Sequence, residues 1–141
     1  MQELFPAEIL QKALVLKVEQ AQTCIFLNDG NGNFTMQPLP VRAQFSPTFA
    51  IVVDDFNKDG ITDLYIAGNF FGLKPQTGRL DANEGTLFLG QPNGSFQFIH
   101  PAQTGLIYRG EARDAAILPL GNHKKALLVT INNAPLLMFE R

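Results

Sequence analysis

The stretch Asp55-Phe-Asn-Lys-Asp-Gly-Ile-Thr-Asp63 decides how the centre of this chain folds. Its side chains with ligating oxygens are Asp55, Asn57, Asp59 and Asp63. Gly60 follows the third of them, where a glycine makes a sharp left-handed turn at least cost. Apolar runs rich in β-branched and aromatic residues flank the stretch at 49–53 and 64–67. They predict two strands that are connected by a polar loop.

The composition of this loop is suited to calcium, which prefers roughly six to eight hard oxygen ligands. The ligands we expect are Asp55, Asn57, Asp59, the backbone carbonyl of Ile61, and Asp63. An EF-hand is not expected, because its twelfth loop position requires a bidentate Glu and that position holds Ile66. The alternative is a polar hairpin turn without metal, since Asp, Asn and Gly are also the commonest turn residues.

The chain also repeats itself. The run Ile25–Phe34 returns as Leu87–Phe96, 62 residues later, with a Leu, a Gly and a Phe in common. Each copy ends a strand in an Asn/Gly turn and begins the next strand at a Phe, which is the pattern of a β-hairpin. Leu64–Asn69 likewise falls on Leu127–Asn132, 63 residues on. We therefore expect the strand after the acidic loop to be repeated too.

The acidic loop itself is not repeated, so one calcium site is expected. At the same offset its four side-chain ligands are replaced by Leu118, Leu120, Asn122 and Ala126. We expect an ordinary turn over 119–125 instead, with Gly121 and Asn122 supplying the turn chemistry.

We divide residues 1–141 into the parts of a single repeat region. They are an N-terminal cap or strand (1–20), a first repeat with the calcium loop (21–69), an inserted loop (70–85), a second, degenerate repeat (86–133) and the start of a third (134–141). Within the first part, Pro6–Lys17 has apolar residues near helical spacing and predicts a short helix. Such a helix would cover an open sheet edge or bind a partner, and we favour the cover.

These motifs resemble those of the FG-GAP or VCBS repeat family. Asp55–Leu64 fits the family's D-F-N-x-D-G-x-x-D-L calcium loop at every defined position, and Leu27–Phe34 fits its L-N-x-G-x-G-x-F hairpin. Other segments look like the C-terminal repeat region of large secreted bacterial proteins similar to cartilage acidic protein; they are Gln37–Pro40, Ala43–Pro47, Gly68-Asn69 and Gly78–Ala82. The resemblance is weakest over 103–125.

In that family the repeats form blades of a β-propeller, as in the head of integrin α-chains, and calcium lies in the loops of individual blades. The resemblance therefore implies an all-β fold of antiparallel propeller blades, with a short N-terminal helix possible. A chain of 141 residues supplies about two to three blades, whereas a ring usually needs about four to eight. We expect a piece of a larger propeller; self-association or a small closed sandwich are the alternatives.

Composition and charge narrow the function classes. With 12 Gly, 9 Pro and 45% hydrophobic residues the chain is turn-rich and forms a core. The runs at 49–53 and 64–67 are nearly continuous in apolar residues, which predicts strands buried on both faces. A net charge of −2 without a basic stripe disfavours nucleic acid, and no apolar run is long enough for membrane insertion. We expect Cys24 to be a buried, inert thiol.

The cellular location rests on the resemblance. The N-terminus has no charged region followed by an apolar region, so no signal peptide is expected in this chain. The family resemblance nevertheless implies a secreted or cell-surface protein, in the bacterial periplasm or outside the cell. Millimolar calcium outside cells is enough for weak sites of this kind.

An enzyme is not expected, because no nucleophile, base and orienting group stand in a recognisable pattern. One alternative is a carbohydrate-active hydrolase that uses the carboxylates of the segments 78–85 and 108–114. It requires Asp81 and Glu84 to converge with Glu111 or Asp114; otherwise Arg/carboxylate pairs in these segments are structural.

The inserted loop 70–85 is a candidate binding surface, because long loops on a rigid β-scaffold often carry recognition. Its contact residues would be Phe70, Phe71 and Leu73, although we favour the packing of these side chains onto the sheet. The expected function is therefore a calcium-stabilised structural or interaction module of the adhesion type. Its partner is another protein or a second copy bound through exposed blade edges, with a glycan as a further possibility.

Overall fold

The computed structural model describes residues 5–122 and 124–141, and it is mostly β, with 41% of residues in strands. All strand pairs are antiparallel, so the expected all-β, antiparallel class is confirmed. The strands are β1 (Cys24–Asn28), β2 (Phe34–Pro38), β3 (Thr48–Asp54), β4 (Asp63–Gly68), β5 (Thr86–Gly90), β6 (Phe96–Ile99), β7 (Ala112–Gly121), β8 (Lys124–Ile131) and β9 (Leu137–Glu140).

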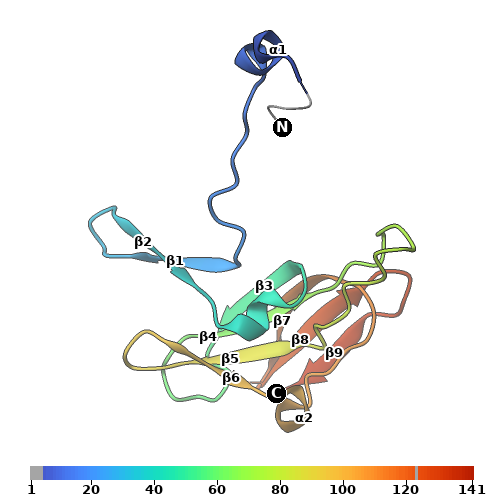
Figure 1. Ribbon diagram of the computed structural model, residues 1–141. Helices are drawn as coiled ribbons and strands as arrows, with labels where there is room; N and C mark the ends of the chain where they lie inside the picture. The colour runs from blue at the N-terminus through green and yellow to red at the C-terminus, as the bar shows by residue number, and fades with distance from the viewer. Residues whose placement is uncertain (1–4, 123) are drawn as a thin grey trace.

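These strands form a two-stranded hairpin β1-β2, a four-stranded sheet β3-β4-β5-β6 and a three-stranded sheet β7-β8-β9 (Figure 1). Neighbours in each sheet are consecutive in the chain, because short turns lead each strand directly into an antiparallel partner. The helices are short: α1 (Ala7–Lys12), the 3-10 helix η1 (Val41–Gln44) and α2 (Pro101–Thr104). The hairpins expected at 25–34 and 87–96 are confirmed as β1-β2 and β5-β6.

The main core lies between the four-stranded and the three-stranded sheet. Alternate side chains of both sheets meet there, among them the fully buried Tyr65, Leu127 and Val129, and they are joined by Tyr108 from the connection between α2 and β7. A second cluster covers the other face of the four-stranded sheet, where Phe88 and Ile66 pack with Ala43 of η1 and with Ile25 of β1. The four-stranded sheet is thus the middle layer of the molecule.

Strand β4 is buried along its whole length, as its continuous apolar sequence predicts. The same prediction is wrong for β3, in which buried Ala50 and Val52 alternate with exposed Phe49, Ile51 and Val53. The physical reason is coverage: β3 is the edge strand of the middle sheet, and the β1-β2 hairpin lies over the second cluster without reaching β3's outer face.

The short N-terminal helix is confirmed over Ala7–Lys12, but its expected role as a cover is wrong. None of its residues is buried, and the extended segment after it carries it away from the sheets (Figure 1). The first four residues of the proposed cap lie outside the described residues. Across the described part of the chain, the helices are all too short or too polar to span a bilayer.

Cys24 also differs from expectation. It is half-buried at the start of β1 rather than enclosed in the core, and its thiol donates a hydrogen bond to the Gln22 carbonyl at 3.2 Å. The turn expected over 119–125 is a tight hairpin between β7 and β8, in which Gly121 and Asn122 both have positive φ, as their turn chemistry predicts; residue 123 lies outside the described residues.

Candidate metal site

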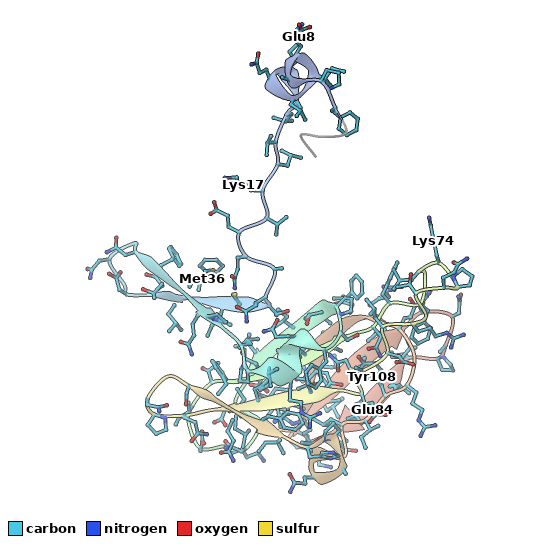
Figure 2. The ribbon with its side chains drawn as sticks, in the orientation of Figure 1. Glu8, Lys17, Met36, Lys74, Glu84 and Tyr108 are labelled. Carbon is cyan, nitrogen blue, oxygen red and sulfur yellow. The ribbon has the colours of Figure 1, made fainter. Side chains whose placement is uncertain are left out.

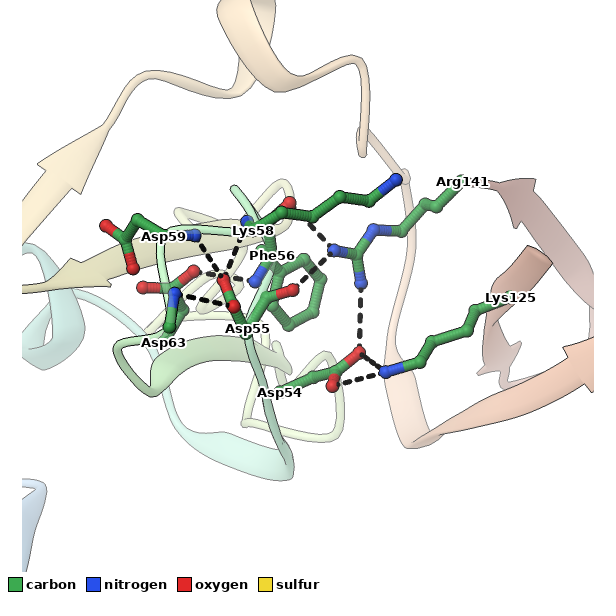
Figure 3. Close-up of polar contacts among 9 residues, drawn as sticks. Asp54, Asp55, Phe56, Lys58, Asp59, Asp63, Lys125 and Arg141 are labelled. Carbon is green, nitrogen blue, oxygen red and sulfur yellow. Dashed lines mark hydrogen bonds and ion pairs between the residues drawn. The ribbon is translucent and has the colours of Figure 1, made fainter. Parts of the chain in front are cut away.

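The acidic loop connects β3 to β4 and lies at one end of the middle sheet (Figure 3). Asp54 closes β3 and pairs with Asp63, which opens β4, so the loop leaves and re-enters the sheet at one pair of residues. The sequence had placed all five expected ligands between these two strands, and the structure confirms the strands on either side.

Asp63 is the most enclosed of the expected ligands, with no exposed surface. Its Oδ2 accepts a hydrogen bond from the Phe56 N–H at 2.7 Å, and its Oδ1 accepts one from the Gly90 N–H at 2.8 Å. A buried carboxylate is costly unless it is hydrogen-bonded, and these two donors meet that need. Asp63 therefore joins the loop to β5 as well as to β3.

Gly90 makes this contact possible by having no side chain. A Cβ at this position would lie 2.2 Å from the Thr62 carbonyl oxygen and 2.8 Å from Cγ2 of Ile61. Both distances are shorter than real Cβ contacts, so any other residue would push β5 away from the loop and break the Gly90–Asp63 hydrogen bond.

Asp55 organises the loop from inside. Its Oδ1 accepts from the N–H groups of Lys58 and Asp59 at 2.7 and 3.1 Å, and its Oδ2 accepts from the Gly60 N–H at 2.9 Å. Figure 3 shows Asp55 at the centre of these contacts. Lys58 and Gly60 have φ values of 65° and 84°, and the sharp left-handed turn expected at Gly60 is confirmed.

Asn57 and Asp59 are exposed and contact each other. The Asn57 Nδ2 donates to Asp59 Oδ2 at 2.7 Å, and its Oδ1 accepts from the Asp59 N–H at 3.0 Å. Asp59 Oδ1 in turn accepts from the Ile61 N–H at 2.7 Å. Four of the expected ligands thus lie in the loop and Asp63 follows it at the start of β4, but the side chains of all four side-chain ligands accept hydrogen bonds from backbone N–H groups.

The loop offers the ligand atoms that calcium prefers, but its carboxylates are not positioned around one point. Three carboxylates and one amide offer the hard oxygens that calcium prefers, and each carboxylate has more acceptor sites than its N–H donors occupy. Within residues 5–122 and 124–141, however, no three acidic, His or Cys side chains are grouped closely enough to hold a metal ion. Calcium would therefore have to draw Asp55, Asp59 and Asp63 closer together.

Two cations of the three-stranded sheet bind the base of the loop. Lys125 Nζ lies 2.7 Å from Asp54 Oδ1, and Arg141 donates to Asp54 Oδ2 at 3.4 Å. Burial acts to raise the pKa of Asp54, but the hydrogen bond from Lys125 and the positive charges of Lys125 and Arg141 outweigh it and hold the pKa below its usual range. Asp54 is thus an ion-pair partner rather than a metal ligand.

Arg141 also contacts the loop backbone and an aromatic ring. Its Nη2 donates to the Phe56 carbonyl at 2.8 Å, and its guanidinium lies 3.8 Å from the centre of the Phe56 ring. Phe56 in turn stacks on the buried Tyr65, with ring centres 6.2 Å apart. This column of side chains connects the loop to the core between the sheets.

The segments 78–85 and 108–114, named for the hydrolase alternative, do lie together. A surface cavity of about 290 Å³ is lined by Asp81 and Glu84 from the first segment and by Tyr108 and Arg109 from the second. Glu111 and Asp114 are not among its lining residues. The convergence of carboxylates from both segments that the hydrolase alternative requires is therefore not found at this cavity.

Glu111 has a different role. Its carboxylate accepts hydrogen bonds from the Asn132 amide at 2.8 Å, from the Phe71 N–H at 2.7 Å and from Arg113 at 2.8 Å. These partners, led by Asn132 and Phe71, hold the pKa of Glu111 below its usual range, whereas a general acid needs a raised pKa. Glu111 therefore fastens the inserted loop to β7 and β8.

The inserted loop packs onto the molecule through its first residues. Phe70 forms an isolated bridge with Leu80 and lies 6.5 Å from Phe49, measured between ring centres. Arg79 lies over the Phe71 ring at 4.8 Å. Phe70, Phe71 and Leu73 are all half-buried, which supports the packing role that we favoured over a free binding surface.

Sequence reasoning missed the residues that hold the loop from outside, namely Gly90, Lys125 and Arg141. A signal existed only for Gly90, which ends the repeated run Leu87-Phe-Leu-Gly where the first copy has Asn28. Nothing in the sequence pairs Lys125 or Arg141 with a residue about 70 to 87 positions earlier.

Comparisons with known proteins do not bear on this site. No family model, no curated protein and no solved structure matches the chain. The site is therefore interpreted from its own geometry and chemistry alone.

Proposed function

We propose that this chain is a calcium-stabilised β-propeller repeat module that serves as a structural and interaction domain of a secreted or cell-surface protein. In this proposal the middle sheet is one complete blade, the β7-β8-β9 sheet is three strands of the next, and β1-β2 is the outer half of the preceding one. The support is that successive meander sheets stack face to face and share a core.

The observation that carries the calcium part is the charge of the loop. Asp55, Asp59 and Asp63 lie within nine residues that hold one cation, Lys58, while the nearby cations Lys125 and Arg141 pair with Asp54 instead. Like charges at such spacing repel, and a divalent cation relieves that repulsion. The ligands would be the four side chains of Asp55, Asn57, Asp59 and Asp63 with the carbonyl of Ile61.

Calcium in this role is structural. When bound, the ion neutralises the carboxylates and links the two strands of the hairpin. The protein's own residues do the rest: Asp63 anchors the loop to β5, and Arg141 anchors it to the next sheet. An extracellular location supplies calcium at a concentration that suits an exposed site of this kind.

The test is thermal unfolding in millimolar calcium and in excess chelator. Binding to the native loop alone stabilises by RT ln(1 + [L]/Kd), which is about 2.7 kcal/mol when calcium is present at 100 times Kd. We expect Asp59→Asn to remove most of this difference, because it deletes one charge but keeps an acceptor for the Ile61 N–H. Asp63 is less suitable for the test, since its hydrogen bonds are needed without metal too.

Asp29→Asn is the matched control. Asp29 lies in the exposed turn between β1 and β2 and accepts from the Asn31 N–H at 2.7 Å, as Asp59 does from Ile61, but it is not part of the acidic loop. The control should keep the full calcium response. If the wild type melted at the same temperature in calcium and in chelator, the loop would be a polar turn that does not bind calcium.

A further inference from the structure

Equivalent aromatic residues of the three sheets have opposite exposures. Phe26 in β1, Phe88 in β5 and Phe139 in β9 occupy matching positions: 25–27 resembles 87–89 in sequence, and Phe88 and Phe139 pair with the equivalent residues Leu64 and Leu127. Phe88 is fully buried under the second cluster, and Phe139 packs against the main core. Phe26, in contrast, is 63% exposed. We call the face that carries these residues the entry face of each sheet.

The residues one position earlier lie on the opposite face, which we call the exit face. Ile25 packs on the second cluster, and Leu87 is 7% exposed in the main core. Met138 is the matching residue of the last sheet, and it is 60% exposed. Each exit face inside the chain therefore covers the entry face of the next sheet, while one entry face and one exit face stay bare.

The segment before β1 resembles a strand that would extend the bare entry face. Lys12-Ala-Leu-Val-Leu-Lys-Val18 matches Lys125-Ala-Leu-Leu-Val-Thr-Ile131 of β8 without a gap, 113 residues earlier. Leu14 is 84% exposed, although its equivalent Leu127 is fully buried. In the last sheet Leu127 pairs with Phe139, so Leu14 and Phe26 are equivalent to cross-strand neighbours on one face.

The centre of the bare exit face is also apolar, with Asp114 at one end of the face and Glu140 at the other. In the last sheet Ala116, Leu128 and Met138 form a row of paired positions, and Leu118 lies two residues along β7. Leu118 is exposed, as is Met138. Figure 2 shows Met36, which pairs with Phe26, on the hairpin that projects from the stacked sheets, so the entry face is open to a partner.

We propose that the entry face of β1-β2 docks against the exit face of β7-β8-β9 of a second copy of this chain. The internal stack supplies the template, since the same type of exit face already covers the same type of entry face at two places in the chain. A head-to-tail contact of two different faces closes a ring or extends a row of copies. The inference rests on the interaction part of the proposed function and does not require calcium.

In the proposed assembly, the 13–18 segment becomes an additional strand beside β1. By equivalence with β8 and β9, residues 13–16 pair with residues 24–27 on the free edge of β1. Their apolar side chains then contact the second copy instead of water, which stabilises by about 25 cal/mol per Å² of apolar surface removed from water.

The test is the mass in solution over a range of concentrations, in calcium and in chelator. The wild type is expected to exceed the monomer mass of 15.5 kDa as concentration rises, in both conditions. Phe26→Asp breaks the entry face and Met138→Asp breaks the exit face, so each variant alone should stay monomeric. Ile107→Asp is the matched control, because Ile107 is exposed and apolar but lies outside the strands.

An equimolar mixture of the two variants decides the geometry. Phe26→Asp keeps its exit face and Met138→Asp keeps its entry face, so together they should form a complex of two chains that neither forms alone. Met36→Asp, on the same face as Phe26, replaces Phe26→Asp if that variant melts below the wild type. Hydrogen exchange at residues 13–18 should slow on assembly.

Two outcomes would overturn the proposal. A wild type that remains monomeric at every concentration would assign the bare faces to another partner, such as an upstream part of a longer chain. Variants that still assemble alone, or a mixture that stays monomeric, would exclude the head-to-tail contact. Neither outcome affects the calcium proposal, whose readout is the calcium-dependent melting temperature of the monomer.

Discussion

The hairpins β3-β4 and β7-β8 have second strands that repeat in sequence, but the two hairpins are closed in opposite ways. At the end of the first pair, buried Asp63 directs its carboxylate to two backbone N–H groups and supports an eight-residue loop. At the matching position of the second pair, Ala126 is equally buried and the strands join in a tight turn. The residue at this equivalent position thus differs with the connection: an Asp holds the long loop through hydrogen bonds, and an Ala is enough for the tight turn.

The largest expected effect comes from making the second hairpin resemble the first. Ala126→Asp places a carboxylate where no loop supplies N–H donors, so it buries an unpaired charge and should cost more than about 4 kcal/mol of unfolding free energy. Denaturant unfolding measures the loss, and Gln97→Asp, which adds the same charge at an exposed position of β6 opposite Leu89, should change stability by no more than about 0.5 kcal/mol. If Ala126→Asp were as stable as the wild type, position 126 would tolerate a carboxylate as position 63 does, and the contrast between the two hairpins would be wrong.

Replacing Asp63 by the Ala of the second hairpin should cost less unfolding free energy. Asp63→Ala leaves the N–H groups of Phe56 and Gly90 without acceptors, at about 1 to 3 kcal/mol for each buried donor. The loss should appear in chelator as well as in calcium, because these bonds do not involve a metal. Asp63→Asn keeps one acceptor oxygen and should lie between Asp63→Ala and the wild type; a loss confined to calcium would contradict the anchoring role.

Gly90→Ala tests whether the first hairpin depends on its close contact with β5. The added Cβ meets the Thr62 carbonyl at 2.2 Å, and overpacking of this kind costs about 1 to 3 kcal/mol. Thermal unfolding measures the shift. Gln97→Ala, exposed on the neighbouring strand β6, is the control and should leave the melting temperature nearly unchanged.

The contact of Arg141, which follows β9, with the acidic loop should contribute less to the free energy of unfolding. Arg141→Met removes the contacts to the Phe56 carbonyl and ring and should cost about 1 to 2 kcal/mol. Lys124→Met removes an ion pair with Glu140 in which both side chains are exposed, and should cost at most about 0.5 kcal/mol. Equal losses in the two variants would mean that the Arg141 contact adds nothing beyond a surface ion pair.

The smallest expected effect is a pH dependence of stability that arises from the ion pairs of Asp54 with Lys125 and Arg141. The pKa of Asp54 is lower in the folded chain than in the unfolded one, so its contribution is present above the usual aspartate pKa and is lost as pH falls through the lower folded value. Asp54→Asn should therefore be less stable than the wild type at neutral pH, and the difference should shrink below about pH 4. A difference that is constant with pH would exclude the ion pair as its cause.

Local patterns in the sequence determined much of the fold. The apolar runs around the acidic loop, the Asn/Gly turns and the repeats predicted β3, β4, the two hairpins and the tight turn at Gly121 and Asn122. They did so because strand and turn preferences depend on residues that are near one another in the chain. For the same reason four of the five expected ligands lie in one loop and Asp63 follows it as the first residue of β4, although within the described residues the structure does not group the three carboxylates closely enough to hold a metal ion.

Tertiary structure decided which surfaces are covered and what holds the loop. Phe26 and Phe88 have similar local sequences, yet one is exposed and the other buried, because only Phe88 has the β1-β2 hairpin and η1 packed over it. Leu14 to Val18 resemble the buried strand β8 in sequence, but they lie exposed outside the sheets. Arg141 reaches Asp54 and Phe56 only after two sheets stack. Burial and long-range ion pairs depend on contacts between distant segments, and no local pattern encodes them.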